Sequence, residues 1–238
     1  MTGASAPTVE IRILSANVYR QNRQYDKVLD LVRSQSPDIA VFIDINEIWQ
    51  QQLDTLGDLL PYSYGQSGSH LGLLVYSKRP LANVNIELFG TEDNVSVVAQ
   101  IPNEDGPITF VATHPVPPLS SDIFRSRNQQ IDLIGEYINS APTKRRIAVG
   151  DLNITMWSPY YRRLVSKAGL HNTRKGFGIL PTWPTHHPKI PALLAPFVRI
   201  PIDHCLVSEG FWVVNATTGS DIGSDHKPLT VDLAISNR

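Results

Sequence analysis

The sequence predicts an α/β protein built on mixed β-sheets. Apolar runs typical of strands alternate with segments of helical periodicity through the first half of the chain. Short strand-like segments joined by turns, the pattern of hairpins, predominate in the second half. The chain has 238 residues with 42% hydrophobic content, which is enough to bury a sizeable core. We therefore expect one domain over residues 10–238, preceded by a disordered tail of small and polar residues over 1–9.

The composition narrows the classes of partner and compartment. The net charge of −1 argues against a strongly basic surface for sequence-independent binding of duplex nucleic acid. The single cysteine, Cys205, rules out a disulfide within the chain, so nothing requires an oxidising compartment. The chain has no apolar run of 18 residues, so we expect no transmembrane segment. We expect a monomeric soluble domain, either cytoplasmic or a fragment of a membrane-anchored protein, with peripheral membrane contact left open.

Two of the first three predicted elements end at a polar residue. Residues 10–18 begin with alternating apolar and polar side chains, which predicts a strand ending near Asn17. Residues 25–35 carry apolar side chains at helical spacing. Residues 39–43 form a continuous apolar run, which predicts a buried strand ending at Asp44. A charged residue at the end of a buried strand is either exposed at the sheet edge or functional.

Four more strands are predicted, and a histidine follows the last of them. These strands cover residues 71–77, 81–88, 95–101 and 108–113. His114 comes directly after them and precedes a proline-rich run; it is either functional or a cap for the loop backbone. A long helix is expected over residues 120–138. Contact with phosphate is one interpretation of Arg125 and Arg127 near its start, but we expect a solvated helix face.

A carboxylate and a carboxamide stand side by side after the next strand. Residues 147–149 form a short β-rich run, and Gly150 ends it. Asp151 and Asn153 are two residues apart on an extended segment, so they share one face. The pair suits a metal-assisted phosphate site, because Asp can transfer a proton and the Asn amide can donate to a phosphoryl oxygen. Taken alone, a turn with backbone capping is the better interpretation.

The remaining elements include a proline-bounded apolar segment. A helix is expected over residues 158–168. Residues 188–201 are either a packed loop or a partly exposed apolar lip. A strand begins at Ile202, with 211–216 as its hairpin partner, and residues 229–235 form the last strand.

Six short motifs, each at a strand end, carry a resemblance that runs from about Ile11 to Ala234. They are Asn17, Pro37-Asp38 with Asp44, Thr113-His114, Gly150-Asp151-Leu152-Asn153, Ile202-Asp203-His204 and Gly223-Ser224-Asp225-His226. In this order they resemble the endonuclease/exonuclease/phosphatase (DNase I-like) superfamily. The Thr182-Trp183-Pro184 stretch looks closest to a bacterial branch whose members often carry N-terminal membrane helices. The resemblance implies a four-layer α/β sandwich, in which two mixed sheets lie face to face between helices and the active site occupies loops at one end.

The resemblance also implies a metal site. Asp44 stands where the family has a metal-binding Glu, Asn17 lies beside it, and Asp225 is the second carboxylate. Oxygen ligands with room for water suit Mg²⁺, with Mn²⁺ able to substitute. At this position the chain departs from the family, because the side chain of Asp44 is one methylene shorter than that of Glu. Glu47 is an alternative ligand, although we expect it to face solvent.

The same resemblance implies the catalytic residues. His226 looks like the catalytic histidine, and Asp203 like the carboxylate that orients it. Asp151 would activate water or protonate the leaving group, and Asn153 would donate to the phosphoryl group. His114 would stabilise the transition state or assist departure of the leaving group.

These implications predict a divalent-metal-dependent phosphoesterase that hydrolyses phosphodiesters by in-line attack of water. The fold hosts several chemistries, so nucleic acid competes with lipid and small-molecule phosphoesters as substrate. Near-neutral charge and the apolar lip at Leu193–Val198 argue against a surface dedicated to binding duplex DNA, and leave short or single-stranded nucleic acid open. A non-catalytic binding module with a degenerate site is the alternative from another class.

Overall fold

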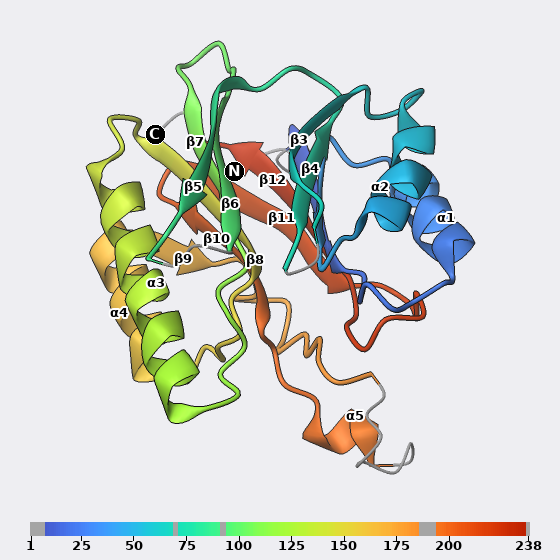
Figure 1. Cartoon of the computed structure of the whole chain (residues 1–238). Coiled ribbons are helices and arrows are strands. Elements are labelled where there is room, and N and C mark those ends of the chain that lie inside the picture. The colour runs from blue at the N-terminus through green and yellow to red at the C-terminus, as the bar shows by residue number, and fades with distance from the viewer. Residues whose placement is uncertain (1–7, 69–70, 91–93, 186–193, 237–238) are drawn as a thin grey trace, which may run out of the picture.

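Two six-stranded mixed sheets lie face to face in this protein (Figure 1). The computed structural model describes residues 8–68, 71–90, 94–185 and 194–236, so most of the predicted tail lies outside the described residues. The first sheet has the order β11-β12-β1-β2-β4-β3. Its strands are β1 (Ile11–Asn17), β2 (Ile39–Ile43), β3 (Tyr62–Gln66), β4 (Leu73–Ser77), β11 (Phe211–Thr218) and β12 (Leu229–Ile235).

The second sheet has the order β5-β6-β7-β8-β10-β9. Its strands are β5 (Ala82–Leu88), β6 (Val95–Ile101), β7 (Ile108–Ala112), β8 (Arg145–Asp151), β9 (Leu170–Asn172) and β10 (Asp203–Ser208). In each sheet one parallel pair, β1 with β2 or β7 with β8, is joined by a helical crossover, and the other named pairs are antiparallel.

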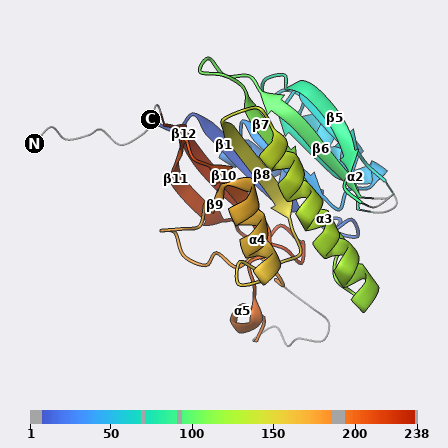
Figure 2. The ribbon, with the colours of Figure 1, turned by 90° about the vertical axis from the view of Figure 1, so that its left-hand side faces the viewer.

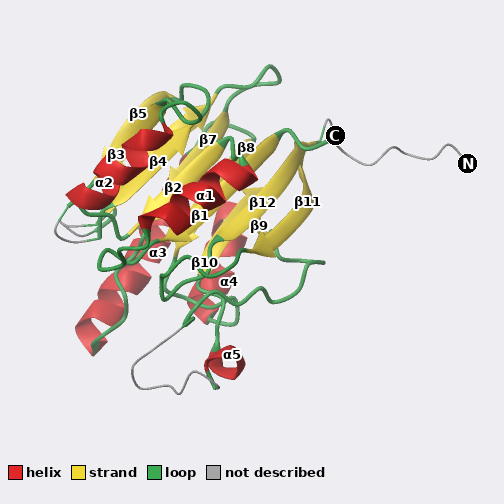
Figure 3. Ribbon diagram, turned by 90° about the vertical axis from the view of Figure 1, so that its right-hand side faces the viewer, coloured by secondary structure: helices red, strands yellow, loops and turns green. Residues whose placement is uncertain are grey.

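Helices cover the outer face of each sheet. Figure 3 shows α1 (Tyr25–Gln35) and α2 (Glu47–Leu53) over the first sheet, with the short 3₁₀ helix η1 (Asp54–Leu56) following α2. Figure 2 shows α3 (Ser121–Ser140) and α4 (Pro159–Ala168) over the second. The side chains of Ser120 and Ser158 accept hydrogen bonds from backbone N–H groups at the starts of α3 and α4. The predicted four-layer sandwich is therefore confirmed.

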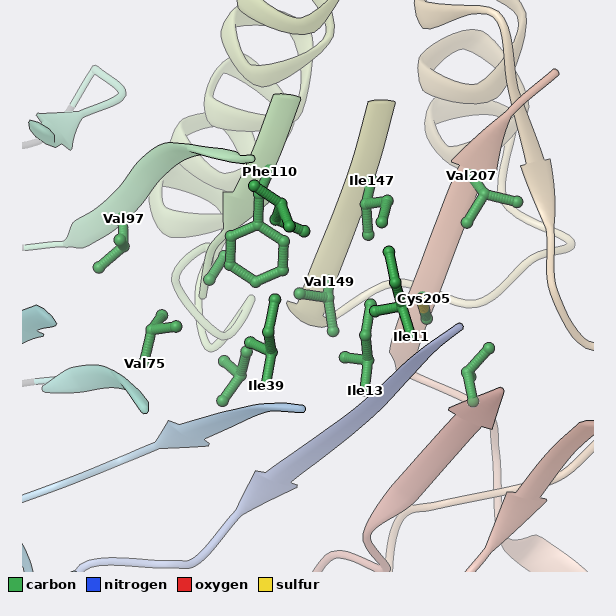
Figure 4. Packing of buried hydrophobic residues seen from close by; sticks show 14 of the residues in the cluster. Ile11, Ile13, Ile39, Val75, Val97, Phe110, Ile147, Val149, Cys205 and Val207 are labelled. Carbon is green, nitrogen blue, oxygen red and sulfur yellow. The ribbon is translucent and has the colours of Figure 1, made fainter. Parts of the chain in front are cut away.

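The main core lies between the two sheets. Aliphatic residues of β1 and β2 face those of β7, β8 and β10, with Phe110 near the centre of the group (Figure 4). Two further apolar clusters join the first sheet to α1 and α2, and the second sheet to α3 and α4. The strands β2, β4 and β7 contribute to clusters on both of their faces and are buried along their whole length. In β2 this burial agrees with the continuous apolar run that predicted a buried strand.

The strand directions bring the predicted polar residues to one end of the sandwich. The carboxyl ends of the parallel strands β1 and β2 lie together, as do those of β7 and β8. The antiparallel strand β10 starts at that same end, where Asp203 pairs in register with Asp151. Gly150 permits the segment after β7 to lie close to the end of β8, because a Cβ at this position would lie 1.9 Å from the Thr113 carbonyl oxygen.

One expectation was wrong, and several short elements were missed. The segment predicted as hairpin partner of the Ile202 strand is β11, which pairs with β12 in the other sheet. The short strands β3 and β9 were not predicted. The proline-bounded segment holds a one-turn helix, α5 (Ala195–Val198), and its described part is an exposed lip, with Phe197 84% exposed. Leu193 lies outside the described residues. No helix in the described ranges is long and apolar enough to cross a membrane.

Candidate active site

A cleft of about 610 Å³ opens at this end of the sandwich. It collects residues from both sheets, and Asp203 alone among the predicted site residues lies behind it. The predicted residues that line the cleft are Asn17, Asp44, His114, Asp151, Asn153, Asp225 and His226. A larger cleft of about 850 Å³ lies around Arg145 and the β10–β11 turn, and it holds none of them.

His226 and Asp203 form a buried hydrogen-bonded pair. The imidazole Nδ1 lies 2.8 Å from Asp203 Oδ2. The backbone of the pair is also held by side chains, because Ser224 Oγ accepts from His226 N at 3.1 Å and Thr182 Oγ1 accepts from Asp203 N at 3.3 Å. Ser224 Oγ in turn donates to the Asn17 carbonyl oxygen, which ties the last loop to β1.

The charges of this pair favour a protonated imidazole. Burial alone lowers the pKa of His226, but the carboxylates of Asp203 and Asp151 outweigh it and raise the pKa to about 10. Burial alone would raise the pKa of Asp203, yet contact with His226 and Thr182 holds it below its ordinary value. At neutral pH we therefore assign a carboxylate to Asp203 and an imidazolium to His226, with a proton on each ring nitrogen.

Asp151 occupies the centre of the site. Its Oδ2 accepts from Asn17 Nδ2 at 3.1 Å and lies 3.6 Å from His226 Nε2 and 3.7 Å from His114 Nε2. Its Oδ1 accepts from the Asn153 backbone N–H at 2.9 Å. Burial raises the pKa of Asp151 to about 7, with a further contribution from the charge of Asp203. This carboxyl group can therefore accept or release a proton near neutral pH.

His114 faces Asp151 and caps no backbone group in the part of the chain that the structure describes. Burial and, to a smaller extent, the charge of His226 lower the pKa of His114 to about 3, so the ring is neutral. Its Nδ1 is buried and has no hydrogen-bond partner among the described residues. A neutral ring with Nε2 toward Asp151 can donate one uncharged hydrogen bond. This placement favours the functional interpretation of His114.

Asn153 reaches the cleft from a left-handed backbone conformation, with φ of 50°. Its Nδ2 donates to the Pro115 carbonyl oxygen at 3.0 Å. Because a carboxamide has two N–H groups, this bond leaves one for other acceptors.

Oxygen-bearing side chains gather on the side of the cleft formed by the first sheet. Asp44 Oδ2 accepts from the Arg20 backbone N–H at 3.1 Å, and Asp225 Oδ2 accepts from Trp183 Nε1 at 3.1 Å. Asn17 Oδ1 accepts from Tyr19 N at 3.1 Å. Burial raises the pKa of Asp44; Arg20 lowers it, and the charge of Asp225 raises it further.

This donor set fits a hard divalent cation. A cation would relieve the repulsion between two carboxylates in a partly buried cleft, and carboxylate and amide oxygens are the ligands that Mg²⁺ takes in proteins. Glu47 is exposed and does not line the cleft, as we expected.

A second group could also hold a metal. The ligand atoms of Asp151, Asp203 and His226 all lie within 4.8 Å of one another. His226 Nδ1 is already engaged by Asp203 in this arrangement. An imidazole nitrogen suits transition metals better than Mg²⁺.

Two residues of the sequence motifs are structural. His204 is buried beside Arg174, and its Nε2 lies 2.8 Å from the Ile154 carbonyl oxygen. Asp38 lies at the opposite end of β2 from the cleft, where its Oδ2 accepts from the Arg12 backbone N–H at 2.8 Å.

Sequence reasoning missed three contacts around the site. Trp183 lines the cleft and donates to Asp225, and Thr182 holds the Asp203 backbone. In the sequence, the Thr182-Trp183-Pro184 stretch indicated a branch of the family but no contact with the site. The expectation that Arg127 is solvated was wrong, because it is buried and its Nη1 donates to the Asn153 carbonyl oxygen. Its neighbour Arg125 is exposed, as expected, and pairs with Asp122.

Comparison with known proteins decides the family. The family model described as Endonuclease/Exonuclease/phosphatase family matches residues 14–226. The chain belongs to this family. No curated protein matches the sequence.

Solved structures share the fold of this family member. It is similar to D. rerio TDP2 complexed with single strand DNA product, at 15% identity over 94% of this chain and 98% of that chain, with a TM-score of 0.78. It is also similar to the endonuclease/exonuclease/phosphatase from Beutenbergia cavernae DSM 12333, at 15% identity over 96% and 72% of the two chains, with a TM-score of 0.74. The human Nocturnin catalytic domain with bound sulfate anion gives 16% identity over 95% and 94%, with a TM-score of 0.72.

Proposed function

We propose that this endonuclease/exonuclease/phosphatase family protein is a divalent-metal-dependent phosphodiesterase. The observation that carries the proposal is the contact of the charged His226–Asp203 pair with Asp151, in a cleft that also holds Asn17, Asp44 and Asp225. An imidazolium, a carboxyl group that titrates near pH 7 and a set of oxygen ligands are the parts that phosphoester hydrolysis requires.

The metal would be Mg²⁺, with Mn²⁺ able to substitute, held by Asn17, Asp44 and Asp225. Bound there, it would neutralise charge that develops on the phosphate and the leaving oxygen. We prefer these residues to the Asp151–Asp203–His226 group, because that group is engaged in its own proton network.

Each catalytic side chain then has one task. Asp151 accepts the proton of the attacking water, for which its pKa near 7 is suited. His226 holds its Nε2 proton toward the phosphoryl oxygens, and Asp203 fixes the orientation and charge of the ring. His114 and Asn153 supply uncharged N–H donors to the same phosphoryl group.

A short or single-stranded nucleic acid is the substrate we favour. The fold is shared with a protein whose structure holds a single strand DNA product. The net charge of −1 suits a strand bound locally better than duplex bound over a long surface. Trp183 lines the cleft and offers an aromatic face to a base. We propose that the protein acts as a monomer.

A phospholipid or another small phosphodiester is the second candidate. It is favoured by the apolar side chains at the cleft, where Leu119 is 83% exposed. Peripheral contact with a membrane would accompany that substrate.

A substrate screen tests the proposal. Plasmid DNA, RNA, a single-stranded oligonucleotide, choline phospholipids, bis-p-nitrophenyl phosphate and p-nitrophenyl phosphate would be incubated with the protein and Mg²⁺. We expect hydrolysis of the diesters over the monoester, and of the oligonucleotide over phospholipid. A binding module would instead cleave none of them and show no saturable Mg²⁺ binding by calorimetry.

A further inference from the structure

Helix α3 buries polar side chains on the face that it turns toward the site. Arg127 is 4% exposed and Gln130 is 2% exposed, although both belong to residue types that normally face solvent. They are three residues apart, so they are neighbours on the helix surface. Burying such groups costs free energy unless each finds a hydrogen-bond partner. Their partners lie on two catalytic loops.

The first loop follows β7 and carries His114. Three consecutive residues of its backbone are each held by a side-chain amide. Asn94 Nδ2 donates to the His114 carbonyl oxygen at 2.8 Å, and Asn153 Nδ2 donates to that of Pro115 at 3.0 Å. Gln130 Oε1 accepts from the Val116 backbone N–H at 2.9 Å. Side chains thus fix the backbone of this segment at the point where the ring of His114 meets Asp151.

The second loop follows β8 and carries Asp151 and Asn153. Arg127 Nη1 donates to the Asn153 carbonyl oxygen. The Asn153 backbone N–H donates to Asp151 Oδ1, and its side chain holds Pro115. The guanidinium is itself oriented by Asn128 Oδ1, 2.9 Å from its Nε, and by the ring of Phe124. Arg127 therefore holds the backbone of Asn153, the residue that links the two loops.

We propose that Arg127 and Gln130 are positioning residues, which set His114 and Asn153 by anchoring both catalytic loops to one face of α3. The inference rests on the proposed phosphodiesterase activity for its kinetic consequence. A displacement of about 1 Å at a reacting group can cost on the order of 100-fold in rate, so residues that touch no substrate can control turnover.

The neighbouring residues of α3 provide matched controls. Gln129 is exposed beside Gln130, and Arg125 is exposed two residues before Arg127. We would compare Gln130→Met with Gln129→Met, and Arg127→Met with Arg125→Met, using bis-p-nitrophenyl phosphate. We expect kcat to fall roughly 10- to 100-fold in the two buried variants with little change in KM, and to stay at the wild-type value in both controls. Gln130→Glu retains an acceptor for Val116 N and should recover most of the rate.

A readout that needs no activity accompanies the kinetics. Hydrogen exchange of the Val116 amide should accelerate in Gln130→Met and remain slow in Gln129→Met and Gln130→Glu, because this amide loses its acceptor only in the first variant. An inactive wild-type protein would contradict the proposed function, and the exchange rates would then decide the positioning role.

Two results would overturn the inference. One is wild-type kcat together with wild-type Val116 exchange in Gln130→Met. The other is a loss of rate that matches the loss of folded protein, with unchanged turnover per folded molecule. Should Gln130→Met fail to fold, Arg127→Met takes its place: it removes the donor to the Asn153 carbonyl oxygen, and normal kcat in that folded variant would equally contradict the positioning role.

Discussion

The carboxylate of Asp203 lies 2.8 Å from Nδ1 of His226, and neither side chain has appreciable contact with solvent. Each group stabilises the charged form of the other, so the pKa of the histidine rises and that of the aspartate falls. The pair therefore presents a proton at Nε2 to the cleft over the whole neutral range. This presentation requires the orientation of the ring as well as its charge.

Replacing Asp203 with Asn should separate catalysis from metal binding. We expect Asp203→Asn to lose about 10²–10⁴-fold in kcat, because the imidazole loses both its orientation and its charge, while Mg²⁺ affinity by calorimetry changes little. Asp232→Asn is the control: this buried carboxylate pairs with Arg12 on β1, away from the cleft, and its loss should lower stability without lowering kcat. Near-normal turnover of folded Asp203→Asn would show that Asp203 is structural.

The pH dependence of kcat/KM distinguishes the two roles of Asp151. A base must be ionised, and the pKa of Asp151 is raised to about 7, so kcat/KM should rise with pH, reach half its maximum near pH 7 and level off above it. It should fall again as pH approaches 10, where His226 loses its proton. In Asp151→Asn the acid limb should disappear along with most of the rate. A profile that declines above pH 7 would identify Asp151 as the acid that protonates the leaving group.

Asp44 provides the test of the metal site. A direct Mg²⁺–oxygen bond needs about 2.1 Å, and one missing methylene withdraws the carboxylate by roughly a bond length. We expect Asp44→Ala to need much more Mg²⁺ for half-maximal rate, and Asp44→Glu to need the same amount or less. Glu47→Ala is the exposed control and should change little.

The reverse pattern would identify Glu47, and not Asp44, as the metal ligand. Loss of activity in Glu47→Ala with an active Asp44→Ala would mean that the metal is bound from α2. If neither variant matters, Asn17, Asp225 and water hold the metal.

Local pattern predicted the elements whose apolar runs are long or periodic. The predicted bounds of β2 and β12 match the structure, because both strands are buried along their length or on one full face. The edge strand β3 contains Ser63 and Gly65 and has no apolar run to reveal it. The three-residue strand β9 is too short to show a period. The wrong partner for β11 has another cause: β10 pairs with β8 on one side and β9 on the other, and local pattern does not reveal that both of its edges are occupied.

The candidate site was predicted from strand ends and from the family resemblance together. Parity on an extended segment predicted that Asp151 and Asn153 share one face. Both line the cleft, although β8 ends at Asp151 and Asn153 has a left-handed backbone conformation. The burial of Arg127 could not be predicted, because helical periodicity does not reveal that a loop carbonyl 26 residues away will accept its hydrogen bond. The tether of Val116 to Gln130 has the same origin in tertiary contact.

Metal-dependent hydrolysis of bis-p-nitrophenyl phosphate tests the central claim most directly. The rate would be measured for the wild-type protein and for His226→Gln, before and after excess EDTA, and again after adding Mg²⁺ or Mn²⁺. We predict that EDTA abolishes the wild-type rate, that either metal restores it, and that His226→Gln is slow throughout. A wild-type rate that persists unchanged in excess EDTA, or a His226→Gln rate equal to that of the wild type, would contradict a metal-dependent phosphodiesterase at this site.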